Sequence, residues 1–414
     1  ENIWSHEETW NNWTYQRDLK LKRLFTSKNI KWHEIHVNGV FRGLNDRKLW
    51  TSMFYQEMEK IPYEKPDKLN SIDILSETLP SADDLGIKSI ECPYRQRGGE
   101  REAQNVLNSF LKLRSFDYSK NISSPTHSHE TCSRLSTYLA FGNISLKQIF
   151  YYTKTAINAF KDGEDYANNM NLRSINAFKN RLRWRSHFIQ KLEDQPNIEN
   201  QNLHDAYNDI RDGYFNEDLY HAWQEGQTGF PLIDACMRSL INTGWINFRM
   251  RAMLVSFASN NLWMDWRKFA HHLSNIFTDY EPGIHYSQIQ MQSGTTGINT
   301  IRIYNPVKQG NDHDPEGIFV KTWLPELSDI SKEYIHTPWL SPVSAKGYLD
   351  PIVNELSARK LAAKAVYEIR KNSDFKKLAK NIYVKHGSRK RSKLKFGISK
   401  NKKSEIIHQE ELPL

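Results

Sequence analysis

The 414-residue chain is poor in cysteine and has no long apolar run. Its three cysteines, Cys92, Cys132 and Cys236, lie far apart, which argues against a disulfide framework and against a four-cysteine iron–sulfur cluster. No apolar stretch approaches the roughly 20 residues that a membrane-spanning helix needs. We therefore expect a cytoplasmic protein without a membrane segment. The chain begins at Glu1 without a signal-peptide pattern, and we expect its natural start to lie upstream.

Several common catalytic signatures are also absent. The sequence has no P-loop, no glycine fingerprint for dinucleotides and no nucleophile elbow. His127, His129 and Cys132 stand at a spacing that metal ligands use, but no fourth ligand lies nearby in the sequence, and a structural zinc site needs four. We therefore predict no metal site.

The net charge of +9 comes from one end of the chain. Residues 379–403 contain ten Lys and Arg residues and no acidic residue, which leaves 47 basic against 48 acidic residues elsewhere. The body of the protein is therefore neutral. The basic end either adds unspecific attraction to phosphates or is a solvated tail with no partner of its own.

The pattern of apolar and turn-forming residues changes along the chain. Early residues mix a helical pattern with a β-like run, and a stretch rich in turn residues follows. After that stretch, apolar residues recur at helical spacing. We predict a mainly α fold with an α/β remnant (1–60), a linker (61–100), a helical domain (101–375) and a basic, disordered tail (376–414).

Aromatic side chains are abundant, with twelve tryptophans in the chain. Trp223, Trp245, Trp263 and Trp266 fall within one interval of 44 positions. Because aromatic rings bury the largest area per residue, packing in the core is the first expectation for each of them.

A stretch with two small hydroxyls and one arginine, CSRLSTYLAFG, begins at Cys132. Ser133 has the character of a helix N-cap, apolar residues follow at helical spacing, and Gly142 stands where a glycine ends a helix. The unpaired N–H groups of a helix start, together with Ser133, Arg134 and Ser136, suit a phosphate group. Taken alone, the same residues also fit an ordinary capped helix with a surface arginine.

A second helix is predicted over the stretch NAFKNRLRWRSHFIQ. Phe178, Arg181, Arg185 and Phe188 fall on one face of it, with Trp184 at the border. By itself this pattern fits an amphipathic helix whose arginines extend past apolar neighbours to water.

Several stretches, in their order and spacing, resemble the DNA photolyase/cryptochrome family. They are SRLSTYLAFGNIS, NRLRWRSHFIQ, AWQEGQTGFPLIDACMRSLINTGWINFRMRAMLVSF, MDWR and RIYNPVKQG with the following DPEGIFVKTWLPEL. The N-terminal residues are similar to the end of that family's antenna-bearing α/β domain, and the rest resembles its all-helical FAD-binding domain. The resemblance implies that this chain binds FAD, and it names no antenna chromophore.

In that family, the segment similar to CSRLS holds the FAD pyrophosphate. The resemblance gives this role to Ser133, Arg134, Leu135 and Ser136. Cys132 stands where many relatives have threonine, which removes one hydroxyl donor. The further cofactor-binding residues that we expect near the FAD are Tyr118, Cys132, Phe178, Trp245 and Phe248.

The flavin ring of the family lies beside a paired arginine and aspartate, and Arg251 and Asp279 match them. Glu281 matches an acidic position at the pyrimidine edge of the ring, where a carboxylate accepts a hydrogen bond from N3–H. His285 stands next to flavin N5, where the family commonly has asparagine, aspartate or cysteine. The same resemblance implies that Arg185 contacts the FAD phosphates.

Trp184 resembles the tryptophan that stacks on the pyrimidine lesion, and Met291 replaces another tryptophan of that cavity. Arg181 stands where photolyases that split cyclobutane dimers usually carry a glutamate. A glutamate accepts a hydrogen bond from thymine, whereas an arginine only donates. Asn247 and Phe248 occupy the place of the histidine of enzymes that repair pyrimidine–pyrimidone photoproducts, so such repair is not expected.

The family's chain of three tryptophans that leads to the flavin is interrupted. Only Trp266 matches, in the middle place, while Ile289 occupies the place beside the flavin and the surface-side place falls near Gly213. Isoleucine does not relay an electron, so photoreduction needs another route. The candidates for this route are Tyr286, Trp263 and Trp223.

The resemblance therefore predicts light-driven DNA repair, in which reduced and excited FAD donates an electron to a pyrimidine dimer flipped into the cavity. The residues to which we assign this chemistry are Trp184, Arg181, Trp266, His285 and Met291. The alternative is a cryptochrome-like blue-light photoreceptor without repair activity, and a non-catalytic nucleic-acid-binding relative is a third possibility. Damaged DNA is the expected partner, no membrane is expected, and a monomer is the default.

Overall fold

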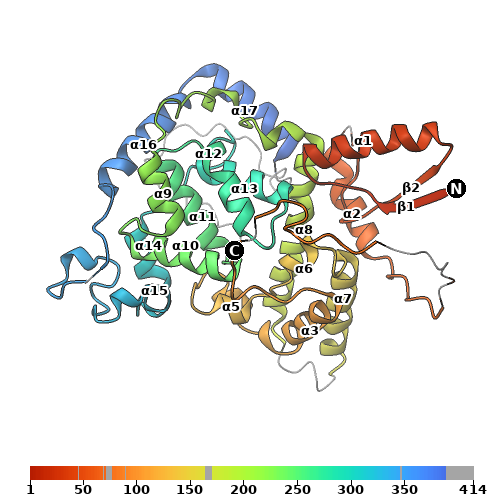
Figure 1. Ribbon diagram of the computed structural model, residues 1–414, viewed down its shortest axis with the longest axis horizontal. Coiled ribbons are helices and arrows are strands. Elements are labelled where there is room, and N and C mark those ends of the chain that lie inside the picture. Colours follow the sequence, from red (N-terminus) through yellow and green to blue (C-terminus); the bar gives the residue numbers. More distant parts are fainter. Residues whose placement is uncertain are drawn as a thin grey trace, which may run out of the picture.

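The computed structural model describes residues 1–44, 46–68, 70, 77–88, 90–163, 170–345 and 347–387. Within these residues the chain is mainly helical, and its strands form one two-stranded parallel sheet. The sequence predicted this fold class, a helical domain preceded by a short α/β segment (Figure 1). In this part of the chain, no helix combines the length and the apolar character that crossing a membrane requires.

The N-terminal segment is a strand–helix–strand unit. β1 (Asn2–His6) and β2 (Lys31–Ile35) pair in parallel, and α1 (Asn12–Ser27) connects them. α1 begins after Asn11, because the side chain of this residue accepts a hydrogen bond from the backbone N–H of Thr14. In Figure 1 the unit projects from one end of the helical body.

The helical body contains two groups of elements. The first group consists of η1 (Arg47–Leu49), α2 (Trp50–Met58), α3 (Glu100–Ser109), the π-helical turn η2 (Phe110–Arg114), α4 (Tyr118–Asn121), α5 (Ser128–Thr131), α6 (Ser136–Ala140), α7 (Leu146–Lys161) and α8 (Leu172–Asp194). The second group consists of η4 (Pro196–Glu199), η5 (Asp205–Tyr207), α9 (Glu217–Glu225), α10 (Pro231–Thr243), α11 (Phe248–Ser256), the π-helical turn η6 (Phe257–Asn261), α12 (Trp266–Ile276), α13 (Pro282–Ser293), α14 (Pro306–His313), α15 (Ile318–Trp323), η7 (Pro325–Leu327), η8 (Pro338–Leu340), α16 (Glu355–Ile369) and α17 (Ser373–His386).

The hydrophobic core has two main parts, and α8 contributes to the first of them. Ile175, Phe178 and Leu182 of α8 pack there with α2, α3, α6 and α7. These side chains recur every three to four residues, which is the spacing that forms the apolar face of a helix. The face predicted from the sequence, with Phe178, Arg181, Arg185 and Phe188, shares only Phe178 with them. The second part lies among α9–α13 and α15 and encloses Trp223 and Trp266.

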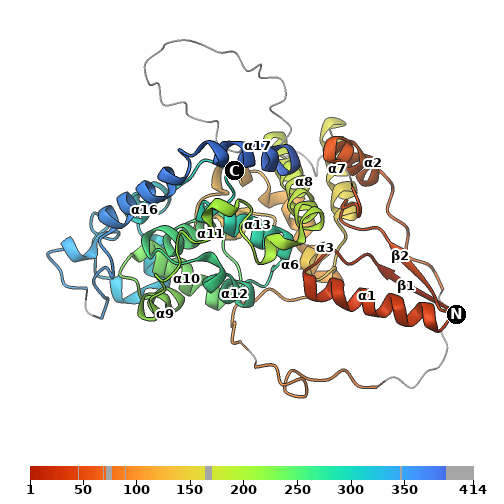
Figure 2. The same ribbon diagram turned by 90° about the horizontal axis from the view of Figure 1, so that it is seen from above.

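α8 and α13 lie side by side in the middle of the molecule (Figures 1 and 2). The two helices approach closely at Gly283, where an added Cβ would lie 2.5 Å from the Cα atom of Ile189. Any side chain at this position would therefore push the helices apart. Gly283 thus allows the middle of α8 and the start of α13 to meet, and the candidate site is built at this contact.

The segment before α6, residues 132–135, differs from the sequence prediction. Ser133 does not begin the helix, because α6 begins three residues later, at Ser136, with Leu135 as its N-cap. The cause is Arg134, whose φ of +59° lies in the left-handed region and interrupts the helical path. Gly142 follows the end of the helix with a φ of +67°, as the sequence predicted.

The predicted basic tail begins later than expected. Residues 376–386 belong to α17 and are not a disordered end. Phe375, Ile382 and His386 are buried at positions that share one face of this helix, and this burial holds it on the body. The tail from residue 388 onward lies outside the described residues. Between α2 and α3 the described residues form neither helix nor strand, and the predicted domain boundaries stay predictions.

Candidate functional site

A buried ion pair joins α8 to the start of α13. Arg185 Nη2 lies 3.0 Å from Glu281 Oε2, and only 9% and 8% of the two side chains are exposed. Arg185 Nη1 donates to Asn38 Oδ1 at 3.1 Å, and Nη2 donates to the carbonyl oxygen of Leu139 at 3.4 Å. The guanidinium is therefore directed to Glu281, and its predicted contact with the FAD phosphates stays a prediction.

Burial dominates the electrostatics of this pair. Burial raises the pKa of Glu281 from 4.5 to about 7, although the charge of Arg185 and the backbone N–H of Gly283 act against the rise. Burial also lowers the pKa of Arg185. Glu281 Oε1 is buried and has no hydrogen-bond partner. A buried acceptor without a partner is costly, so Glu281 is suited to receive a hydrogen bond from a ligand.

A second ion pair, with two hydrogen bonds, joins α11 to the segment before α13. Arg251 Nη1 and Nη2 donate to Asp279 Oδ1 and Oδ2 at 2.9 and 2.8 Å. Arg251 Nε donates to the carbonyl oxygen of Ile246 at 2.8 Å, and the guanidinium lies 4.1 Å from the ring centroid of Phe277. The structure thus brings Arg251 and Asp279 together, and the bidentate geometry fixes the plane of the guanidinium.

His285 is buried in the first turn of α13. Its Nε2 makes a hydrogen bond of 2.9 Å with the carbonyl oxygen of Ala270, so Nε2 carries the proton and Nδ1 is the acceptor in the neutral ring. Burial lowers the pKa of His285 to about 4, against the effect of this hydrogen bond. The charges of Arg251 and Asp279 also act on the ring. His285 is therefore a neutral imidazole beside the second ion pair at neutral pH.

Arg134 provides a buried cation before α6. Its Nε and Nη2 donate to Gln96 Oε1 at 3.2 and 3.0 Å, and its guanidinium lies 4.1 Å from the ring centroid of Trp245. Arg134 Nη1 is buried and has no partner. Burial lowers the pKa of Arg134 to about 10, while the charges of Asp279 and Arg251 also act on it. Arg134 therefore shares one electrostatic environment with the second ion pair.

Two residues that sequence reasoning missed hold the segment before α6. Arg114 donates to the carbonyl oxygens of Cys132 and of Ser133, the latter at 3.3 Å. Gln96 Nε2 donates to the carbonyl oxygen of Arg134 at 3.1 Å. No local pattern marks either residue, because Gln96 lies in the turn-rich stretch and Arg114 ends a π-helical turn. Their roles arise only when distant segments meet.

Arg181 interacts with Tyr118. A hydrogen bond between the two side chains acts on the pKa values of both, and burial raises the pKa of Tyr118 and lowers that of Arg181. Tyr118 packs edge-on against Phe110 and Phe178, with ring centroids 5.6 and 6.2 Å away. Cys132 is close enough to act on Arg181 electrostatically. This cluster therefore borders the segment before α6.

The other predicted residues of the lesion cavity are half-buried. The ring centroid of Trp184 lies 5.0 Å from that of His187 and 5.7 Å from that of Phe188, both on α8. Met291 is half-buried near the end of α13, and Phe248 is half-buried at the first residue of α11. Trp184 thus has aromatic neighbours on its own helix and remains partly accessible.

Trp223, Trp266 and Tyr286, named for electron transfer, lie in the second part of the core, whereas Trp263 packs against a smaller cluster. Trp266 is buried, its Nε1 donates to Asn202 Oδ1 at 2.7 Å, and its ring centroid lies 6.2 Å from that of Tyr286. Ile289 is buried on α13. Trp223 packs 5.4 Å from Phe269 in the second part of the core. Of the three candidates for the electron route, Tyr286 is the one whose ring contacts Trp266 among the described residues.

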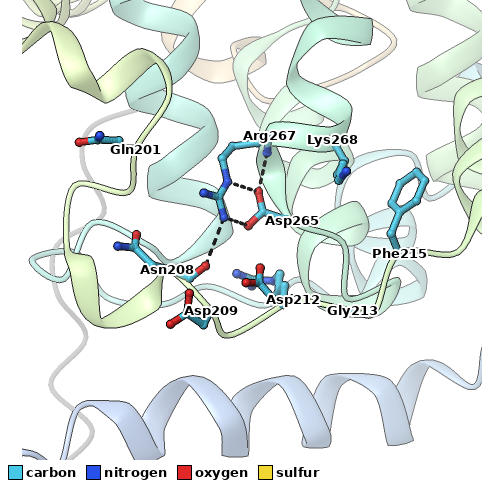
Figure 3. Close-up of a pocket in the computed structure, with 10 residues that line it drawn as sticks. Gln201, Asn208, Asp209, Asp212, Gly213, Phe215, Asp265, Arg267 and Lys268 are labelled. Atoms are coloured by element: carbon cyan, nitrogen blue, oxygen red, sulfur yellow. Dashed lines mark hydrogen bonds and ion pairs between the residues drawn. The ribbon is translucent and has the colours of Figure 1, made fainter.

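Gly213 lines a surface hollow of about 770 Å³ (Figure 3). A Cβ added to Gly213 would meet no atom within 4 Å, so nothing packs near the place that the family's surface-side tryptophan occupies by resemblance. On the wall of the hollow, Arg267 Nε and Nη2 donate to Asp265 Oδ1 and Oδ2 at 2.8 and 2.7 Å. These charges satisfy each other, and the hollow shares no residue with the two ion pairs of the candidate site.

The residues of the site fit FAD at two points. Arg134 Nη1 and Thr137 Oγ1 are buried donors without partners, and the half-buried Ser133 and Ser136 are their neighbours in the sequence, on either side of the start of α6. A charged donor with hydroxyl groups beside it suits a diphosphate. Glu281 Oε1 is an unpartnered acceptor, which suits the N–H of a flavin ring.

Comparisons with known proteins point to one family. Residues 178–368 match the family described as the FAD binding domain of DNA photolyase. The chain is 31% identical over 275 residues to the deoxyribodipyrimidine photo-lyase of Alkalihalophilus pseudofirmus, which covers 64% of this chain and 54% of the relative. It is also 31% identical over 348 residues to Cryptochrome-2 of Arabidopsis thaliana, which covers 78% of this chain and 55% of the relative. The chain thus spans a little over half the length of these relatives.

A solved structure has a similar fold. It is that of an archaeal photolyase from Sulfolobus tokodaii with two FAD molecules, and it matches with a TM-score of 0.69 at 29% identity. The match covers 88% of this chain and 78% of the archaeal chain. Photolyases and a cryptochrome both stand among the relatives, so similarity alone does not separate DNA repair from light sensing.

Proposed function

Because this chain belongs to the photolyase/cryptochrome family and contains its FAD-binding domain, we propose that it is a light-driven, FAD-dependent DNA-repair protein that splits pyrimidine dimers. The observation that carries the proposal is a pair of buried atoms without protein partners, Arg134 Nη1 and Glu281 Oε1. The first is a cationic donor and the second is an acceptor. FAD has a diphosphate and an imide N–H that require one of each.

In this proposal the segment before α6 binds the FAD pyrophosphate. Arg134 donates from Nη1, while Gln96 and the ring of Trp245 hold its guanidinium in place. Ser133 and Ser136 add hydroxyl donors. Such charge-assisted hydrogen bonds are about twice as strong as neutral ones, and several of them together fix the phosphates in one position.

The residues around the start of α13 bind the flavin ring. Glu281 Oε1 accepts the imide N–H, and Arg185 holds the opposite oxygen of the carboxylate. Arg251, fixed by Asp279, contributes positive charge, and the neutral His285 offers Nδ1 as an acceptor. Bound FAD, once reduced and excited by light, supplies the electron that splits the dimer.

Damaged DNA is the partner in this proposal, and Trp184 provides the surface on which a flipped dimer stacks. Base–aromatic stacking tolerates different bases because every base has a π-face. Arg181 is held by Tyr118, and it meets the dimer or a DNA phosphate only as a donor. The predicted cytoplasmic location and monomeric state stay predictions.

Two observations favour the alternative of a blue-light photoreceptor without repair activity. Arg181 is engaged by Tyr118 in the place where a carboxylate would accept a hydrogen bond from thymine. Ile289 is buried where a tryptophan relay is expected. Neither residue is among the FAD contacts proposed above, so a protein with these features can absorb light without repairing DNA.

The test is a repair assay with chemically reduced protein. Reduction by dithionite bypasses any photoreduction route, so the assay measures the lesion cavity alone. We expect light-dependent loss of cyclobutane dimers from an oligonucleotide, and no loss in the dark. FAD-loaded, reduced protein that leaves the dimers intact under light would exclude the repair function and favour the photoreceptor.

A further inference from the structure

Asn38 contacts the Arg185–Glu281 pair from the N-terminal segment. Its Oδ1 accepts a hydrogen bond from Arg185 Nη1 at 3.1 Å, between residues 147 positions apart. Asn38 has a φ of +60°, in the left-handed region that asparagine enters more readily than most residues. The unusual backbone thus occurs at the residue whose side chain touches the ion pair.

The loop that carries Asn38 is fastened to α8. Ser186 Oγ donates to the carbonyl oxygen of Asn38 at 2.5 Å. The backbone N–H of Phe41 donates to Gln190 Oε1 at 2.7 Å, and Gln190 Nε2 donates to the carbonyl oxygen of Phe41 at 2.9 Å. Gly39 lies so close to the core that it has no room for a side chain. These contacts hold Asn38 at a fixed position relative to Arg185.

The two ion pairs of the site differ in a way that Asn38 explains. Arg251 uses both Nη atoms on the two oxygens of Asp279, which is the strong, bidentate geometry that arginine and carboxylate adopt when nothing interferes. Arg185 reaches only one oxygen of Glu281, because its Nη1 is occupied by Asn38. The other oxygen of Glu281 therefore stays without a protein partner.

We propose that Asn38 is a positioning residue, which holds Arg185 in a one-pronged pair with Glu281 and so keeps Oε1 of Glu281 available for the N–H of the flavin. The inference rests on the proposed function, since it assumes that FAD binds at Glu281. A guanidinium carries its five N–H donors in one plane, so anchoring Nη1 fixes the direction of Nη2. Without the anchor, Arg185 turns to bind both oxygens of Glu281, and the acceptor is lost.

The electrostatic effect of this change has a definite sign. The charged groups that act on Glu281 are Arg185 on α8 and Glu8 on the N-terminal segment, and the backbone N–H of Gly283 also lowers its pKa. A second hydrogen bond from Arg185 to Glu281 would stabilise the ionised carboxylate and lower the pKa of Glu281. Simple loosening of the loop would instead weaken the attraction of Arg185 and raise this pKa.

The experiment measures FAD release from the full chain, purified with its flavin, by flavin fluorescence after dilution. Release is followed across the pH range around the Glu281 pKa of about 7. Asn38→Gly removes the acceptor and keeps the left-handed backbone, which glycine adopts readily. Ser186→Ala is the matched control, because it removes a hydrogen bond to the same loop and leaves Asn38 Oδ1 in place. Thermal unfolding of all three proteins reports general loss of stability.

We expect wild-type FAD release to slow as the pH rises and Glu281 ionises. Asn38→Gly should release FAD about tenfold faster, the loss expected for one hydrogen bond to a charged group, and its pH midpoint should lie below that of the wild type. Ser186→Ala should keep the wild-type midpoint even where it lowers the unfolding temperature.

Three results would overturn the inference. An unchanged midpoint and rate in Asn38→Gly, or a midpoint that moves upward, shows that Asn38 does not set the pairing of Arg185. An equal shift in Ser186→Ala shows that the effect belongs to the loop as a whole. Both results leave FAD binding intact, whereas a wild-type chain that retains no FAD removes the proposed function and this inference together.

Discussion

The hydroxyl group of Tyr280 donates a hydrogen bond of 3.4 Å to the hydroxyl group of Tyr286, whose ring contacts that of Trp266. On the other side, the ring centroid of Tyr280 lies 5.7 Å from that of Trp10 in the N-terminal segment. Trp10 is 39% exposed, whereas Trp266 is buried. The four rings therefore form a continuous series of contacts from the surface to the core, near the position where Ile289 interrupts the expected tryptophans.

This contact predicts the effect of Tyr286→Phe on photoreduction. The variant keeps the ring and its packing but removes the hydroxyl group that meets Tyr280 and loses its proton when the ring is oxidised. We expect light-driven reduction of bound FAD by a thiol to be slow in the wild type compared with relatives that have three tryptophans, and several-fold slower still in Tyr286→Phe. Absorbance of the oxidised flavin under blue light measures both rates.

Tyr220→Phe is the control, because the ring of Tyr220 stacks on Trp223 and is not one of the four rings of this series, although it packs in the same part of the core. It should reduce at the wild-type rate. Fast reduction of the wild-type protein, unaffected by Tyr286→Phe, would show that electrons arrive by another route.

Arg185→Ala should weaken FAD retention. The change leaves Glu281 without its cation, and a charge-assisted hydrogen bond contributes about 1.5–3 kcal/mol, so the affinity should fall roughly ten- to a hundredfold. The ratio of flavin to protein absorbance after dialysis measures the loss. Arg173→Ala, at the exposed start of the same helix, should retain FAD fully. Wild-type protein that remains colourless with excess FAD would refute the cofactor site itself.

The raised pKa of Glu281 makes stability depend on pH. The folded carboxyl keeps its proton up to a pKa of about 7, whereas the unfolded one loses it near 4.5, so the folded state binds more protons between these values. Stability therefore falls as the pH rises through this window. Relative to Glu281→Gln, flavin-free wild type should lose about 2 kcal/mol of unfolding free energy between about pH 5 and pH 7. If the unfolding free energies of both proteins, measured with urea, change with pH in parallel, the raised pKa of Glu281 is contradicted.

Lys191, which is buried on α8, should show the opposite dependence. Burial lowers its pKa from 10.5 to about 7, and the charge of Arg47 adds to the effect. Above this pKa the unfolded amine binds a proton that the folded one does not, so stability rises with pH. Relative to Lys191→Met, the wild type should gain about 2 kcal/mol between about pH 7 and pH 9. If the unfolding free energies of both proteins, measured with urea, change equally with pH, the amine is solvated.

Trp184→Ala should lower the affinity for dimer-containing DNA. Stacking on an aromatic ring contributes about 1–3 kcal/mol per base, so the loss should be about ten- to a hundredfold. Binding to undamaged duplex depends on phosphate contacts and should change little. Competition binding in moderate salt separates the two DNAs, and equal affinity of the wild type for both would end the photolyase proposal.

Arg181→Glu should preserve or raise the repair yield. The structure gives a reason, since the hydroxyl group of Tyr118 that now interacts with Arg181 can donate to a carboxylate in its place. The new carboxylate can also accept a hydrogen bond from thymine. The measurement is the quantum yield of dimer splitting with reduced protein. A strong fall in yield, with FAD content unchanged, would show that the arginine itself takes part in repair.

The fold was predictable because its signals are local. The apolar residues of α8 recur at helical spacing, and Gly142 ends α6 where the sequence indicated. The start of α6 was not predictable, because the left-handed backbone of Arg134 depends on Gln96 and Trp245, which approach it only in the folded chain. The charge of the tail hides α17 in the sequence, whereas Phe375 and Ile382, two turns apart, are buried on one face of this helix.

In the candidate site, too, single residues were predictable from the sequence, whereas their contacts with distant segments were not. The resemblance selected Arg185 and Glu281 as single residues, yet it did not indicate that they pair across 96 positions. Asn38 gave no signal in the sequence, since its importance comes from a backbone angle and from one contact with a distant helix. Arg114 was likewise invisible, because its partners are backbone carbonyl groups, which every residue possesses.

The side-chain amide of Gln190 on α8 bonds both backbone groups of Phe41, as a residue of a neighbouring strand does in a β-sheet. The amide hydrogen of Phe41 is protected from exchange with deuterium only while the loop stays docked on α8. Its exchange rate therefore measures how often the N-terminal segment separates from the helical body. A ligand that stabilises α8 without contacting the loop should also slow this exchange. The exchange rate of this one amide hydrogen therefore reports both the docking of the N-terminal segment and the stability of α8.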